Sequence, residues 1–144
     1  DAEGLELEKD LKNRLANIEE AVNFIEKNAS VSVKEYFEKI KERANQLVAD
    51  LSNNIERLNV ELALLSERAD VTEECVRLKS HIKLFYETLE KPEEAGRKLN
   101  FIVQEMNRET NTINSKSLST EISHKGILIK EEIEKIREQI QNIE

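Results

Sequence analysis

The sequence contains little that would interrupt or cross-link helices. It has one proline, three glycines, one cysteine and no tryptophan in 144 residues, while 36% of its residues are charged. Proline and glycine weaken helices more than other residues, so their scarcity together with the high charge is typical of long helices in a coil or bundle. The lone cysteine, Cys75, excludes a disulfide framework and a Cys/His zinc motif, and we expect it to be a small core residue.

Two further absences restrict the class of function. No apolar run is long enough to span a bilayer, so we expect no membrane partner and a cytoplasmic location. Basic residues are not in excess either, since 22 Lys and Arg stand against 30 Asp and Glu, giving a net charge of −8. This balance argues against nucleic-acid binding unless basic residues are locally grouped, a metal ion offsets the carboxylates, or another part of a longer protein supplies positive charge.

The spacing of apolar residues predicts an all-α fold, in which long helices form a helical hairpin or stalk followed by a C-terminal helical bundle. Apolar residues recur at intervals of three and four along most of the chain, and no stretch alternates as a strand does. The predicted helices run from about 3 to 27, through 36–51, from 55 to 69, from about 70 to 90, from 92 to an interrupting polar segment at 114–120, and from 122 to 143. We therefore divide the chain into a helical arm, 1–54, and a C-terminal helical module, 55–144.

Short polar segments mark the predicted ends of these helices. Residues 28–32 (NASVS) are expected to break the first helix, so that the helices on either side form a hairpin, and residues 52–54 give a weaker break. Asp70 and Glu73 have the spacing of a capping box, in which each side chain satisfies a backbone amide at the start of a helix. Pro92 suits the first turn of the following helix.

The segment 96–116 (GRKLNFIVQEMNRETNTINSK) is richer in amides than a structural helix requires. Asparagine weakens a helix because its side chain competes for backbone hydrogen bonds, yet this segment contains four. On a helix, two polar rows lie beside an apolar side made of Leu99, Ile102, Val103, Met106 and Thr110, with Phe101 at its margin. The rows consist of Gln104, Asn107, Arg108 and Asn111, and of Glu105, Arg108 and Glu109. Such rows suit either a rigidly mounted functional site or a salt-bridge and amide network at a buried helix contact.

A second polar face is predicted on the preceding helix. Glu73, Arg77 and His81 follow one another at intervals of four residues, and Glu74 lies one turn from Arg77. Carboxylate, guanidinium and imidazole groups are the base, cation and acid that cleavage of an RNA phosphodiester needs. Structural alternatives stay open for each: Glu73 as a cap, Arg77 as a neutralising partner, and His81 as a surface histidine paired to a carboxylate. The other histidine, His124, is expected to be exposed.

Three separated segments resemble the C-terminal domain of the YicC-like endoribonucleases. They are residues 68–81 (RADVTEECVRLKSH), residues 96–116 with GRKLNF, QEMNRETNTI and SK, and residues 136–144 (IREQIQNIE). The resemblance is strong over about 59–144, and the opening DAEGLEL with Asp10 and Leu11 resembles the junction between the two halves of the family's proteins. It implies that the chain is a C-terminal fragment, preceded in family members by a half with its own mixed α/β domain.

The resemblance implies a metal-assisted endoribonuclease that cleaves single-stranded or loop RNA, with no DNA partner. It also implies a ring-like homo-oligomer, a hexamer, in which RNA enters between protomers. The predicted catalytic residues are His81, Glu74, Arg77, Glu105, Arg108 and Glu109. The predicted RNA-binding residues are Asn107, Asn111, Gln104, Arg97, Ser115 and Lys116. Glu74, Glu105 and Glu109 are predicted to hold Mg²⁺ or Mn²⁺ if the two motif helices pack face to face.

Two other functions are compatible with the same pattern. The chain could be a non-catalytic helical oligomerisation or RNA-binding adaptor module whose polar cluster is a buried specificity network, or it could bind RNA without cleaving it. The adaptor predicts that His81→Ala and Glu105→Ala alter assembly or melting, whereas the nuclease predicts folded variants that no longer cleave. Among the aromatic residues, Tyr86 could stack on bases, while Phe85 falls with the apolar positions and is expected in the core.

Overall fold

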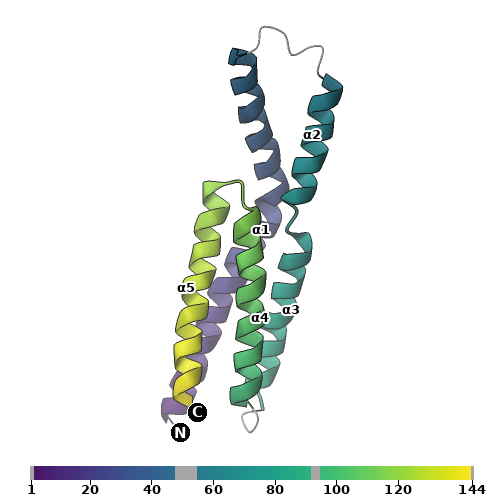
Figure 1. Cartoon of the computed structure of the whole chain (residues 1–144). Helices are drawn as coiled ribbons and strands as arrows, with labels where there is room; N and C mark the ends of the chain where they lie inside the picture. The colour runs from purple at the N-terminus through teal and green to yellow at the C-terminus, as the bar shows by residue number, and fades with distance from the viewer. Residues whose placement is uncertain (1, 48–54, 92–94, 144) are drawn as a thin grey trace.

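The protein is built from α-helices, as its computed structural model shows for residues 2–47, 55–91 and 95–143, the described residues. The helices are α1 (Ala2–Leu47), α2 (Ile55–Arg68), α3 (Thr72–Leu89), α4 (Ala95–Lys116) and α5 (Thr120–Ile143). No strand occurs in these three ranges. The predicted all-α fold is therefore confirmed (Figure 1).

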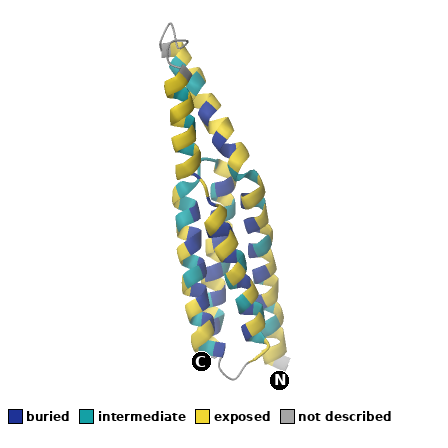
Figure 2. Cartoon of the chain, turned by 90° about the vertical axis from the view of Figure 1, so that its right-hand side faces the viewer, coloured by how far each residue is buried: buried dark blue, intermediate teal, exposed yellow. Residues whose placement is uncertain are grey.

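Four of the helices form a bundle, and a two-helix arm extends from one end of it. The N-terminal half of α1 packs against α3 and α5, which in turn pack against α4, while its C-terminal half continues past the bundle beside α2 (Figure 1). With 46 residues, α1 is about 70 Å long, so a single helix serves both parts. Buried positions gather along the inner faces of the bundle, and the arm is mostly exposed (Figure 2).

The predicted break at residues 28–32 is wrong, because α1 runs through it without interruption. The Asn28 amide donates to the carbonyl of Phe24 at 2.8 Å, and the Ser32 hydroxyl donates to the carbonyl of Ala29 at 2.8 Å. These polar side chains bond to carbonyls of their own helix instead of capping a new one. A helical hairpin does exist, but it consists of the C-terminal half of α1 and α2. Its connection at residues 48–54, including the expected break at 52–54, lies outside the described residues.

The bundle core draws on residues from both ends of the chain. The α1 residues in it are Leu11, Leu15, Ile18, Ala21, Val22 and Ile25. They share one cluster with Leu78, Ile82 and Phe85 of α3, with Leu99, Ile102, Val103 and Met106 of α4, and with Ile129, Ile133, Ile136 and Ile140 of α5. The apolar side predicted for α4 and the core position of Phe85 are thus confirmed. The division into 1–54 and 55–144 stays a prediction, since its boundary lies outside the described residues.

Polar contacts reinforce the packing of α1 against α5. The Arg14 guanidinium lies 3.0 Å from the Asp10 carboxylate and 3.5 Å from that of Glu132. The Gln139 amide also donates to Asp10, and this hydrogen bond, with the Arg14 contact, lowers the pKa of Asp10 below its usual value. On the same helix as Glu132, Ile127 is 52% exposed and so lies outside the buried side of α5.

The start of α3 differs from the predicted capping box. Helix α3 begins at Thr72, and Asp70 accepts hydrogen bonds from the Thr72 amide at 2.9 Å and from its hydroxyl at 2.6 Å. These two bonds lower the pKa of Asp70. Glu73 pairs with Arg77 instead of reaching back to the helix start.

Cys75 is fully buried and burial raises its pKa to about 11, which confirms it as a core residue. The expectation for Pro92 falls outside the described residues.

Helices α4 and α5 approach each other closely at Gly126. A Cβ atom added there would lie 1.7 Å from the side-chain oxygen of Asn114, a separation that real atoms do not tolerate. That oxygen is buried and has no hydrogen-bond partner among the described residues. Glycine is therefore needed at position 126 for space rather than for backbone freedom, because its φ angle is an ordinary helical one.

We expect Gly126→Ala to lower the free energy of unfolding by about 1–3 kcal/mol, as overpacking does in other cores. Chemical denaturation measures the change. Adding Asn114→Ala should restore the lost stability, since it removes both the clash and a buried oxygen without a partner. Gly4→Ala, at an exposed position of α1, is the matched control and should not destabilise the protein. Equal stability of Gly126→Ala and the wild type would contradict the close contact.

Candidate active site

An ion network joins α3 to α4 near the middle of the bundle. The Arg77 Nε donates to Glu109 Oε1 at 2.9 Å, its Nη1 lies 3.3 Å from Glu73, and its Nη2 lies 3.6 Å from Glu74. The pKa of Arg77 is raised, mainly by its hydrogen bond with Glu109 and in addition by Glu73 and Glu74. Three carboxylates from two helices thus surround one guanidinium, whose side chain remains 48% exposed.

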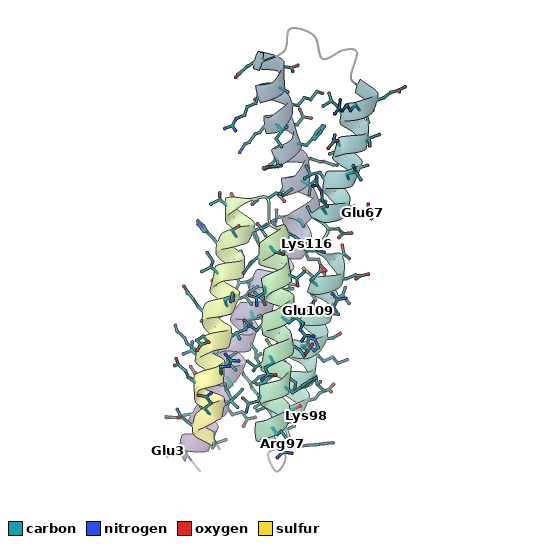
Figure 3. The ribbon with its side chains drawn as sticks, in the orientation of Figure 1. Glu3, Glu67, Arg97, Lys98, Glu109 and Lys116 are labelled. Carbon is teal, nitrogen blue, oxygen red and sulfur yellow. The ribbon has the colours of Figure 1, made fainter. Side chains whose placement is uncertain are left out.

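Lys116 extends this network to the start of α3. Its Nζ donates to Glu74 Oε1 at 3.0 Å and to the backbone carbonyl of Asp70 at 3.0 Å. Glu74 is only 5% exposed, and its second oxygen, Oε2, is buried without a hydrogen-bond partner among the described residues. Figure 3 shows Lys116 at the end of α4 nearest the arm, with Glu109 two turns away on the same helix. Lys116, predicted to bind RNA, therefore contacts the predicted catalytic residue Glu74.

The register of the two helices places His81 opposite Glu105. Helices α3 and α4 run antiparallel (Figure 1), and Arg77 is paired with Glu109. One further turn along α3 leads to His81, and one turn back along α4 leads to Glu105. His81 is partly exposed and makes no hydrogen bond or ion pair within the described residues. Glu105 lies 3.8 Å from Arg108 of its own helix.

Five of the six predicted catalytic residues thus fall into two groups. Glu74, Arg77 and Glu109 are in direct contact, and His81 and Glu105 lie one turn further along the same helix pair. Arg108 is set apart on the outer face of α4, with a side chain that is 75% exposed.

The predicted RNA-binding residues are spread over more than one side of α4. Gln104 and Arg97 are exposed, and Arg97 lies at the end of the helix opposite Lys116 (Figure 3). Asn111 accepts a hydrogen bond from Lys130 of α5 at 2.6 Å. Asn107 is partly buried, and the Ser115 hydroxyl donates to the carbonyl of Thr112 at 2.8 Å.

Two of the asparagines in α4 therefore have structural contacts with α5. Asn111 binds Lys130, and Asn114 packs against Gly126. The amide-rich composition of this helix is explained in part by its packing, as the structural alternative for this segment anticipated. Lys130 was not identified from the sequence, because its contact depends on how α5 is aligned with α4 and leaves no local signal.

The described carboxylates do not form a metal site of the predicted kind. No group of three or more His, Cys, Asp and Glu side chains in the described ranges is arranged to hold a metal ion. Glu74 and Glu109 share the cation Arg77, and Glu105 is paired with Arg108. Because each of these carboxylates is already paired with a cation, the three glutamates do not fit an ion as they stand. The Mg²⁺ or Mn²⁺ ion stays a prediction.

None of the described helices combines the length and the apolar character that a membrane span requires.

Comparison with known proteins points to one family. The family model described as "Endoribonuclease YicC-like, C-terminal" matches residues 25–144. A protein of Clostridioides difficile (strain 630) named "Probable endoribonuclease YicC" is 45% identical over 143 residues, which cover 99% of this chain and 49% of that protein. A protein of Haemophilus influenzae with the same name is 43% identical over 106 residues, 72% of this chain and 37% of that protein. The chain spans about half the length of these curated relatives, or less.

Proposed function

The chain belongs to the YicC-like endoribonuclease family, and on this basis we propose that it is the C-terminal part of an endoribonuclease that cleaves single-stranded or loop RNA. The observation that best supports the proposal is the α3–α4 ion network, with His81 one turn further along α3. The network holds a half-exposed guanidinium in a fixed position, and beside it lies a partly exposed imidazole without a partner among the described residues.

Each group has a role that its surroundings favour. His81 is open to solvent on one side, so it is free to take or give a proton at the reacting 2′-hydroxyl or leaving oxygen. Arg77 is the proposed phosphate stabiliser, because its guanidinium is held by carboxylates yet remains half exposed. Glu74 and Glu109 are proposed to position Arg77, and Glu105, opposite His81, is the candidate base.

The distribution of charge supports RNA contact at α4. This helix has four basic residues, Arg97, Lys98, Arg108 and Lys116, and two acidic ones, Glu105 and Glu109. In each of the other described helices the acidic residues equal or outnumber the basic ones. Basic residues are thus locally grouped, which is one of the conditions under which an acidic chain can still bind a phosphate backbone.

Two further parts of the proposal come from the family resemblance. They are a homo-oligomer, expected to be a hexamer, and a divalent cation, Mg²⁺ or Mn²⁺. A cytoplasmic location is also proposed, from the sequence alone. A divalent cation bound at such a site would offset phosphate charge in the transition state.

The test is cleavage of an end-labelled RNA hairpin with a long single-stranded tail by the full-length protein. We expect cuts in the loop and tail and none in the stem. Parallel reactions with added Mg²⁺, added Mn²⁺ and a chelator decide whether the activity needs a metal ion. An absence of cutting by the full-length protein under all three conditions would overturn the proposal.

A non-catalytic adaptor is the second candidate, and one observation favours it. Arg77, Lys116 and their carboxylate partners bind one another without RNA, as a structural cross-link between α3 and α4 would. If the network is only a cross-link, Arg77→Ala and Glu109→Ala should alter melting or assembly, and the unmodified protein should leave RNA untouched. The nuclease proposal instead expects cleavage by the unmodified protein and its loss in a folded His81→Ala variant.

A further inference from the structure

Phe101 is unusually exposed for a residue that has no polar atom in its side chain. It is 60% exposed, although it was expected at the margin of the apolar side of α4. All six aromatic residues lie in the described ranges, and the next most exposed, Tyr36, is 38% exposed. Tyr86, the residue first considered for stacking on bases, donates its hydroxyl to the carbonyl of Lys12 at 3.4 Å, and burial raises its pKa to about 12. Tyr86 is thus engaged within the bundle.

Phe101 lies on the outer face of α4, which we define as Arg97, Phe101, Gln104, Arg108, Asn111 and Ser115. All six residues are exposed, and they recur at intervals of three or four, so they form one row along the helix. Arg97 and Arg108 lie on either side of Phe101 and are separated by about 16 Å along the helix axis. Both carboxylates of α4 lie off this row, since Glu109 is buried and Glu105 is partly buried.

We propose that Phe101 stacks on an unpaired base while Arg97 and Arg108 contact the phosphates on either side of it. This inference rests on the proposed function, because it assumes that the ligand of α4 is RNA. An aromatic ring offers a flat surface to any base, and flanking cations follow the backbone, which is how single strands are bound without sequence preference. In a duplex the base faces are covered by their neighbours, so the outer face of α4 selects for unpaired RNA.

The composition of the outer face favours RNA over a second copy of the chain. The cores of protein–protein interfaces are apolar and depleted in charge, and stable ones bury about 800 Å² on each partner. The outer face of α4 carries one large apolar side chain between two guanidinium groups and two amides. One aromatic ring with flanking cations and hydrogen-bonding amides matches a nucleotide better than it matches an apolar protein surface.

Three substitutions at this position separate the roles of the ring. Phe101→Leu keeps an apolar side chain but removes the flat ring, and Phe101→Tyr keeps the ring. Phe101→Trp also keeps a ring and adds a fluorophore to a chain that has no tryptophan of its own. Binding is measured with the full-length protein and a 2′-O-methylated single strand, whose integrity is checked on a gel, so that affinity is read separately from cleavage.

We expect Phe101→Leu to weaken single-strand binding by about 5- to 150-fold, the range found for a lost stacking contact. Phe101→Tyr and Phe101→Trp should bind within about 3-fold of the wild type, and RNA should quench the indole fluorescence of the Phe101→Trp variant. The salt dependence of binding should be the same for Phe101→Leu and the wild type, because no phosphate contact is lost. Arg108→Gln should instead make binding less sensitive to salt.

The outcomes distinguish this inference from the proposed function. Unchanged affinity of Phe101→Leu, or failure of the wild type to bind the single strand, overturns the stacking role. A change in oligomeric state on Phe101→Leu, measured by light scattering without RNA, also overturns it and assigns the residue to a protein interface. Ring-dependent binding by a protein that never cleaves RNA supports the stacking role and rejects the nuclease.

Discussion

Replacing His81 with alanine is expected to slow RNA cleavage by about 100- to 10,000-fold, the usual contribution of a positioned acid or base. The imidazole is partly exposed and has no hydrogen bond or ion pair among the described residues, so its loss breaks no polar contact there between α3 and α4. The variant should therefore fold, assemble and bind RNA as the wild type does. Rates are measured with saturating single-stranded RNA, and melting is followed by circular dichroism.

The second histidine provides the matched control. His124 is exposed on α5, and His124→Ala should cleave at the wild-type rate. Added imidazole should restore part of the activity of His81→Ala, which a purely structural role for His81 would not allow. Wild-type cleavage by His81→Ala, or a loss of activity that follows a loss of folding, would count against His81 as acid or base.

Leu15→Ala is expected to lower the free energy of unfolding by about 2–5 kcal/mol, because it leaves a cavity among the bundle helices. Leu15 is fully buried in the core cluster that α1 shares with α3, α4 and α5. For a chain of this size the change corresponds to a fall in melting temperature of roughly 5–20 °C. Thermal unfolding followed at 222 nm measures it.

Leu5→Ala on the same helix is the control, since Leu5 is 68% exposed and its replacement should change the unfolding free energy by less than about 0.5 kcal/mol. The comparison also tests how the chain is divided. If residues 1–54 formed an arm that unfolds by itself, Leu15→Ala would shift only a minor, early transition. A shift of the main transition would show that the N-terminal half of α1 unfolds together with the bundle.

The helical class and most helix positions could be predicted from the sequence because they depend on local spacing. The apolar intervals around Leu99 and Met106 define the buried side of α4 wherever the neighbouring helices lie. The break at residues 28–32 was wrong because Asn28 and Ser32 can satisfy carbonyls of their own helix as readily as they can cap a new one.

The site could be predicted only in part, because it depends on the alignment of two helices. Spacing along one helix placed Arg77 beside Glu73 and Glu74, and the structure confirms both contacts. The contacts of Arg77 with Glu109, and of Lys116 with Glu74, depend on the antiparallel register of α3 and α4, which spacing within one helix does not fix. The exposure of Phe101 likewise depends on how far its neighbours reach around α4.

Because α1 is uninterrupted, the two helices of the arm are joined to the bundle in different ways. On one side the arm is continuous with the bundle, so tilting it requires bending a helix that runs through both. On the other side α2 and α3 are separate helices joined at residues 69–71, where rotation is easier. The Lys116 ammonium group donates a hydrogen bond to the carbonyl of Asp70, which lies in this connection, and another to Glu74. A displacement of the arm at residues 69–71 would therefore reach the buried Glu74 carboxylate through Lys116, which contacts both.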